Sequence, residues 1–530
     1  MEKNKIQSLF FTTLGLLMLA SPALAGTALD MAKTIPIQHN GRVKAFDSFS
    51  RQTVEIITGK ERWQRQDAVT TLLKAIAKKD QIADIPWVQV GPALRAHLKL
   101  DPPDKRFFSY NDLFPFVEKI RSLIESAREK HEADQGTSPV EKEAESLYAR
   151  LVTVKDLMTG DSLRVLPPAD DTTDAWRSPY DGADESGAEF INLAQLFSQN
   201  KPQEFKSLAA AWINRIHHAT SDVYRLTIQL EVFYSSLRPF QLAWVGYLAA
   251  FLFLSAFKKI RAAKAAGLTL AAAAFIFHTL GLILRVVILK RPPVSNMYES
   301  MIYMNWAAML FAAIFTLSSR NTVYLMAGSA VSALVMIYGN LLPIDSNLEV
   351  LVPVLRSNYW LTVHVMTIVS SYGAFGLAMA MGHRHLLLEF SGKFSKTAQE
   401  TSAQLLYRVI QLGVLLLGMG TVLGGVWANE SWGRFWGWDP KETWALITFL
   451  AYLVIVHLKY SKKINAHWLA ISSVVGFFFV LMTWYGVNFV LGRGLHSYGF
   501  GSGGMRWILY YLGAELLFLA FTLNKRPIFK

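Results

Sequence analysis

The sequence predicts an α-helical, polytopic integral membrane bundle preceded by an exported, mainly helical soluble domain. The chain has 530 residues, of which 52% are hydrophobic. From residue 238 onward, about nine apolar spans have the length that a helix needs to cross a bilayer. The region 27–237 is instead polar, shows mostly helical periodicity and is long enough to form a core of its own.

The N-terminus has the pattern of a signal peptide over residues 1–25. Lys3 and Lys5 precede an apolar run at 6–20, and Ala23-Leu24-Ala25 offers the small residues of a cleavage site. An uncleaved N-terminal anchor is the alternative. With either reading, we expect the soluble domain, 26–237, to be exported.

Residues 238–530 form the predicted transmembrane domain. Its spans are expected near 238–257, 265–289, 300–317, 323–341, 360–388, 405–428, 443–459, 466–491 and 506–523. Nine spans after an exported region put the C-terminus inside. Of the 24 Lys and Arg residues in this half, 15 fall in loops predicted to be inside, as the positive-inside rule expects.

Charge and cysteine content exclude two classes of function. The net charge of +13 arises in the membrane half, so it reports topology and needs no nucleic acid as a partner. Because the chain contains no Cys, it forms no disulfide and performs no thiol chemistry. Any dithiol–disulfide redox chemistry must therefore be performed by a partner protein.

The most informative segment is WGRFWGWDPKETW, residues 432–444, which we call the Trp loop. A dense indole cluster offers a flat apolar surface with N–H donors at its edges, which suits a large planar ligand. An interfacial aromatic belt is the alternative, but belts scatter one or two Trp per helix end. Here five Trp fall within eighteen residues, namely Trp427, Trp432, Trp436, Trp438 and Trp444.

Two histidines are predicted on the same outer face as the Trp loop. His364 lies a few residues into the span that starts near 360, and His496 follows the span that ends near 491. Neutral imidazole binds iron well, and haem commonly takes His ligands. A single interfacial His is more often structural, but two that flank one aromatic loop favour an axial pair.

Two further histidines fall inside predicted spans. His457 is expected ~21 Å below the outer face at ~1.5 Å per residue, and His278 lies near the middle of 265–289. Ionisable groups at membrane depth are costly and therefore suggest function. The alternative for each is a neutral imidazole bonded to a neighbouring carbonyl.

A second polar element precedes the span near 300. Pro292 stops the preceding helix, and Ser295 and Asn296 are suited to cap the next one. Arg285 is expected to snorkel outward or to pair with Glu299 or a propionate.

These segments resemble a known family. WGRFWGWDPKETWALITF, starting at Trp432, resembles the tryptophan-rich WWD signature of the CcsA/ResC cytochrome c biogenesis proteins, part of a haem-handling superfamily that includes CcmC and CcmF. The run 439–444 favours the CcsA branch, and PVSNMYES, 293–300, resembles its outer loop. The resemblance covers about 270–500.

The resemblance implies a set of haem b contacts. His364 and His496 would ligate the iron at the outer face, and His457 would be the transmembrane ligand. A second transmembrane His comes from a CcsB/ResB-like half in fused relatives, so a separate partner of that kind is expected, with His278 as the candidate within this chain. The porphyrin would be held by Trp427, Trp432, Trp436, Trp438, Asp439 and Trp444.

The implied function is presentation of haem at the outer face of the bacterial inner membrane. Two Cys thiols of a CxxCH segment in apocytochrome c would join the haem vinyl groups as thioethers. The protein would be a component of a haem lyase with no catalytic side chain of its own, served by a thioredoxin-like thiol reductant. A transporter and a b-type electron-transfer subunit are the alternatives; they predict midplane polar residues and depth-matched His pairs, respectively.

Overall fold

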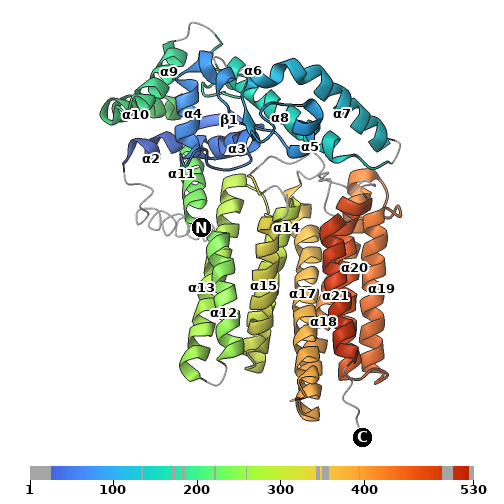
Figure 1. The fold of residues 1–530 in the computed structure, drawn as a ribbon. Helices are drawn as coiled ribbons and strands as arrows, with labels where there is room; N and C mark the ends of the chain where they lie inside the picture. Colours follow the sequence, from blue (N-terminus) through green and yellow to red (C-terminus); the bar gives the residue numbers. More distant parts are fainter. Residues whose placement is uncertain are drawn as a thin grey trace. The chain divides into compact units, whose positions relative to one another are not determined.

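The computed structural model describes most of the chain. The described residues are 26–132, 135–168, 175–181, 185–219, 222–257, 260–341, 346–348, 357–392, 394–491 and 505–524. The predicted signal peptide and His496 lie outside them. The chain divides into two compact units, Met1–Leu237 and Arg238–Lys530 (Figure 1).

The first unit is mainly helical, as predicted, and also contains two short antiparallel hairpins. Its elements are α2 (Ala28–Lys33), β1 (Pro36–His39), β2 (Arg42–Ala45), α3 (Phe46–Thr58), α4 (Ala68–Ile76), the 3₁₀-helix η2 (Lys79–Asp84), β3 (Val88–Gln89), α5 (Pro92–Leu98), β4 (Phe107–Phe108), α6 (Tyr110–Leu113), the 3₁₀-helix η3 (Phe114–Phe116), α7 (Val117–Glu132), α8 (Pro139–Thr159), α9 (Glu185–Ser198), α10 (Pro202–Ala219) and α11 (Asp222–Leu237).

Local sequence explains the first hairpin and the longest helix of this unit. Strands β1 and β2 pair from Pro36↔Ala45 to His39↔Arg42, and the two residues between them, Asn40 and Gly41, both have positive φ. That is the backbone of the tight hairpin turn that Asn-Gly favours. Helix α8 begins with a capping box between Ser138 and Glu141 and ends at Gly160 in the left-handed conformation.

The core of the first unit is aromatic and aliphatic. Phe46, Phe190 and Trp212 are buried and lie in sequence-distant helices. The Phe190 ring lies 6.4 Å from that of Phe46 and 5.6 Å from that of Trp212, in edge and tilted geometries that aromatic pairs favour. The unit therefore has a hydrophobic core of its own.

The second unit is a bundle of long apolar helices that run lengthwise beside one another (Figure 1). Its elements are α12 (Pro239–Ala256), α13 (Arg261–Leu289), α14 (Met297–Ser319), α15 (Val323–Leu341), α16 (Asn358–Trp360), the π-helix η5 (Leu361–Val365), α17 (Met366–Phe390), α18 (Lys396–Trp432), α19 (Pro440–Tyr460), α20 (Ala466–Leu481), the π-helix η6 (Met482–Leu491) and α21 (Met505–Asn524).

The predicted fold class is confirmed. Among the described residues, eight helices are long and apolar enough to cross a membrane, and each overlaps one of the first eight predicted spans. The ninth predicted span, 506–523, coincides with α21, in which the described apolar part is the shorter Ile508–Leu523. The chain is therefore a multi-pass membrane protein.

Small residues permit close helix packing inside the bundle. A Cβ atom at Gly373 of α17 would lie 2.6 Å from the Met304 carbonyl oxygen of α14. Helices in membranes gain little from hydrophobic burial, so their interfaces rely on such close backbone approach. A side chain at this position would force α14 and α17 apart.

A buried ionic cluster ties α13 to the start of α14. The Glu299 carboxylate accepts from Arg285 at 2.8 Å and from Arg291 at 2.7 Å, and Glu299 is 1% exposed. Ser295 donates to it through both its backbone N–H and its hydroxyl. Asn296 caps α14 by accepting from the Glu299 backbone, as predicted. Of the two partners proposed for Arg285, the structure has Glu299.

We expect Glu299→Gln to destabilise the second unit strongly. The amide would leave two buried guanidinium groups without a countercharge, which costs about 3–5 kcal/mol when one partner of a buried pair is removed. The measurement is the free energy of unfolding of the full chain in mixed micelles. Glu400→Gln, at an exposed position of α18, is the control and should change little. Equal stabilities for both variants would show that the cluster contributes nothing.

Candidate functional site

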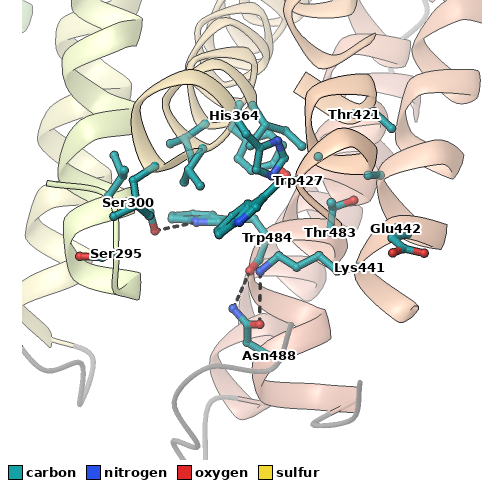
Figure 2. Close-up of a pocket in the computed structure, with 18 of the residues that line it drawn as sticks. Ser295, Ser300, His364, Thr421, Trp427, Lys441, Glu442, Thr483, Trp484 and Asn488 are labelled. Carbon is teal, nitrogen blue, oxygen red and sulfur yellow. Dashed lines mark hydrogen bonds between the residues drawn. The ribbon is translucent and has the colours of Figure 1, made fainter. Parts of the chain in front are cut away.

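Two π-helices meet at one cavity. The π-helix η5 contains His364, and the π-helix η6 contains Thr483, Trp484 and Asn488. All four residues line the same cavity of ≈160 Å³ (Figure 2). Single π-turns inside α-helices occur frequently at functional sites, because the wider turn redirects side chains. The cavity therefore has the local backbone geometry of a working site.

The His364 imidazole is oriented by a backbone carbonyl. Its Nδ1 atom lies 2.8 Å from the Gly420 carbonyl oxygen of α18. A carbonyl only accepts, so Nδ1 carries the proton and Nε2 carries the lone pair of the neutral ring. Metal-binding histidines show this arrangement, with the other ring N–H donated to a carbonyl or carboxylate.

Gly424 gives the imidazole room against α18. A Cβ atom there would lie 2.6 Å from Cε1 and 3.1 Å from Nδ1 of His364. The ring can approach the Gly420 carbonyl because α18 has no side chain at this position.

The Trp427 indole forms part of the cavity wall and is backed by a second indole. Trp427 is largely buried, and its ring centroid lies 5.6 Å from that of His364. Behind it, Trp360 stacks at 6.5 Å with an interplanar angle of 11°. The Trp360 indole donates to Glu430 at 2.7 Å. The stack and this hydrogen bond fix the plane of Trp427 beside His364.

Only one tryptophan of the Trp loop lines the cavity. Trp436 lines it, and Trp438, which is 69% exposed, meets Trp436 edge-on at 5.9 Å. Trp432 lies under the Arg434 guanidinium at 6.0 Å. Neither Trp432 nor Trp444 is among the residues that line the cavity. Two of the five predicted Trp residues, Trp427 and Trp436, therefore lie in its wall.

Asp439 acts locally as a helix cap. Its side chain accepts from the Lys441 backbone, and the Glu442 carboxylate accepts from the backbone of Gly437 and Asp439. With Pro440 at the first helical position, this is a complete capping box for α19. The capping box sets the direction in which the chain leaves the Trp loop and enters the bundle.

Sequence reasoning missed three residues of the cavity. Trp484 lines it and donates from its indole to the Ser300 hydroxyl at 2.9 Å (Figure 2). Lys441 lines it and donates to Asn488 at 3.3 Å. Lys441 belongs to the quoted Trp loop, so its charge beside five indoles was the available signal. Trp484 and Asn488 stand in an apolar span without any comparable pattern.

The remaining predicted histidines occupy different environments. His457 is exposed on α19, 17 residues after Pro440 or about 26 Å along the helix at ~1.5 Å per residue. Its Nδ1 donates to the Leu453 carbonyl at 2.7 Å. His278 is fully buried, with one ring nitrogen 3.1 Å from the Tyr247 hydroxyl and the other 3.1 Å from the Ile302 carbonyl. That enclosure favours a structural role for His278.

Eight membrane-length helices among the described residues and an oriented imidazole among indoles define a multi-pass membrane protein with an aromatic cavity. Residues 294–496 match the family described as Cytochrome C assembly protein. Protein NrfI of Wolinella succinogenes is 42% identical over 43% of this chain. The matched segment spans 25% of that relative's length.

Shorter relatives are matched over most of their length. Cytochrome c biogenesis protein CcsA of Guillardia theta is 38% identical over 39% of this chain and 76% of its own. The CcsA protein of Prochlorococcus marinus is 34% identical over 48% of this chain and 93% of its own. The chain therefore belongs to the CcsA family of cytochrome c biogenesis proteins, which confirms the resemblance and supports a role in cytochrome c maturation.

We expect Gly424→Ala to impair cytochrome c maturation while leaving the protein in the membrane. The new methyl group would displace the His364 ring, and a misplacement of about 1 Å at a working site can lower a rate by about 100-fold. The measurement is the yield of covalent cytochrome c per amount of membrane-inserted protein. Gly513→Ala in α21 is the control, because a Cβ there meets nothing within 4 Å. Full yield from Gly424→Ala would contradict the placement of His364.

Proposed function

We propose that this protein binds haem b beside the Trp loop and presents it for covalent attachment to apocytochrome c. The observation that supports this most directly is His364, whose lone-pair nitrogen is fixed by the Gly420 carbonyl in a cavity walled by indoles. Imidazole is a common haem ligand, and indoles suit a porphyrin face. The residues present therefore fit the group.

The small volume of the cavity favours a haem that is partly exposed over one that is fully enclosed. Its ≈160 Å³ is below the ~300–1,000 Å³ of typical ligand pockets. A porphyrin ligated by His364 would therefore extend beyond the cavity. An edge left outside in this way stays accessible to a protein substrate.

Bound haem would supply the vinyl groups to which two thiols of a CxxCH segment add, each S–H adding across one vinyl double bond to form a thioether. This chain contains no Cys, so both thiols come from the substrate. The contributions of the protein are ligation, orientation and restriction of side reactions. His496, outside the described residues, stays the predicted second ligand.

Lys441 gives the cavity a positive charge that suits a carboxylate. Its ammonium group lines the cavity and donates to the neutral side chain of Asn488 at 3.3 Å, and it also interacts electrostatically with the Asp439 carboxylate. A haem propionate would provide a charge-assisted hydrogen bond. We therefore assign Lys441 to propionate binding, as a positioning residue.

His457 belongs to a different depth of the bundle. It lies about 26 Å along α19 from Pro440, where the helix begins, at ~1.5 Å per residue, so it cannot ligate the same iron as His364. An exposed imidazole on a membrane-spanning helix is costly unless a ligand or partner covers it. We propose that His457 is a transmembrane haem ligand, completed by a CcsB/ResB-like partner. A thioredoxin-like partner would keep the substrate thiols reduced.

We expect His364→Ala to abolish maturation while leaving the protein in the membrane. Loss of one axial ligand leaves a coordination position that a small molecule can occupy, so added imidazole should restore part of the activity. His97→Ala, at an exposed position in the first unit, is the control.

Haem content separates the two histidines. His364→Ala and His496→Ala should retain haem at the depth of His457, whereas His457→Ala should deplete haem at both depths. Haem is quantified on matched amounts of each purified variant. Normal maturation in His364→Ala would refute the outer site, and wild-type haem in His457→Ala would make that residue structural.

We expect Lys441→Met to weaken haem binding by about tenfold, which corresponds to about 1.4 kcal/mol. The loss should vanish when haem dimethyl ester replaces haem, because the ester has no carboxylate to pair. Haem titration of the purified protein, followed by absorbance, gives both affinities. An equal loss for the ester would show that Lys441 acts on cavity shape rather than on charge.

We further propose that the Trp loop faces the periplasm and the C-terminus faces the cytoplasm, as the charge distribution predicts. Reporter fusions near residue 435 and at Lys530 are expected to report opposite sides. A cytoplasmic signal near residue 435 would exclude presentation of haem to an exported substrate.

A further inference from the structure

A second cavity in the membrane unit is larger than the one beside His364. It has a volume of ≈910 Å³, and its wall is mostly apolar. Methionines of α14 and α15, including Met301, Met304 and Met326, form part of this wall. None of its lining residues belongs to α19, so it is separate from His457.

This cavity opens sideways, toward the space that a bilayer occupies. Three of its lining residues are strongly exposed although they lie on apolar helices. Leu334 of α15 is 67% exposed, Leu387 of α17 is 50% exposed and Tyr510 of α21 is 65% exposed. A ligand from the bilayer can therefore enter without passing through water.

Arg384 supplies an unpaired positive charge to the cavity, whose lining also contains His383 and Glu515. It is half-buried, lines the cavity, and has no hydrogen-bond or ion-pair partner among the described residues. The neighbouring His383 is already engaged, with its ring nitrogens 2.9 Å from the Glu515 carboxylate and 2.9 Å from the Met379 carbonyl. An unpaired guanidinium beside so much apolar surface is costly and calls for an anion.

The position of Arg384 along its helix corresponds to the depth of the lipid headgroups. It follows His364 by 20 residues along η5 and α17, which is about 30 Å at ~1.5 Å per residue and equals the ~30 Å hydrocarbon core of a bilayer. Arg384 therefore lies one bilayer thickness from the Trp-loop end. That is where the phosphates of the opposite leaflet are found.

We propose that this cavity binds one anionic phospholipid, with its phosphate on Arg384 and its acyl chains along the apolar wall. The lining runs along α15 from Met326 to Tyr338, 12 residues or about 18 Å, which is close to half of the ~30 Å hydrocarbon core. One leaflet's acyl chain fits that length. The Glu515 carboxylate in the lining is engaged by His383, so the unpaired guanidinium of Arg384 favours an anionic headgroup over a zwitterionic one.

The test measures lipid retention by the full-length protein in detergent. Purified protein is mixed with equal amounts of phosphatidylglycerol and phosphatidylcholine, and the bound lipids are identified by native mass spectrometry. We expect the wild type to retain one phosphatidylglycerol in preference to phosphatidylcholine. In Arg384→Gln, retention should fall about tenfold, the scale of a lost charge-assisted hydrogen bond.

Three further variants keep the result interpretable. Arg384→Lys should preserve the preference for phosphatidylglycerol. Arg408→Gln, which removes an exposed guanidinium that does not line the cavity, should leave retention unchanged. Ala330→Phe should reduce retention by filling the cavity while Arg384 remains.

Two results would overturn the proposal. One is equal retention of phosphatidylglycerol by the wild type and Arg384→Gln. The other is loss of co-purified haem, with phosphatidylglycerol unchanged, in Arg384→Gln and Ala330→Phe. That second result would make the cavity a haem site. Because the test reads lipid, its outcome is independent of whether haem binds beside His364.

Discussion

A carboxylate buried in a membrane-spanning unit needs a positively charged partner. In this bundle the buried carboxylate of Glu299 pairs with two arginines. Two arginines and Ser295 satisfy its oxygens, while Asn296 caps the helix whose first turn contains Glu299. Removal of ions from water is expensive, so such a cluster fixes geometry more than it adds stability. The next residue, Ser300, accepts from the Trp484 indole. The ionic cluster therefore positions one wall of the cavity that contains His364.

The wall that contains His364 depends on α18, where one backbone carbonyl accepts a hydrogen bond from outside its own helix. A helical carbonyl has two lone pairs, and the Gly420 oxygen of α18 uses this capacity to accept from His364 Nδ1. The approach requires a glycine at position 424 and a wider turn in the helix that contains His364. The hydrogen bond that orients the imidazole thus depends on how closely two helix backbones pack.

Hydropathy and composition were enough to predict the membrane spans, because a helix that crosses a bilayer must be long and apolar however it packs. They also indicated the Trp loop, whose density of indoles is rare, and His364, which lines one cavity together with Trp427 and Trp436. They could not reveal Trp484, since an indole in an apolar span looks like core. The two π-helices leave no mark on a 3.6-residue pattern. Depth alone also could not separate His278, bonded on both nitrogens, from the exposed His457.

Trp484 belongs to both cavities of the membrane unit, and this links their chemistry. One side of its indole faces the His364 cavity, and the residue also lines the larger cavity that contains Arg384. Packing inside proteins is dense, so material against one face of a buried ring restricts its movement toward that face. An occupant of the larger cavity would hold Trp484 against Ser300 and so keep the wall beside His364 in place. That occupant would then contribute to the shape of the cavity that contains His364.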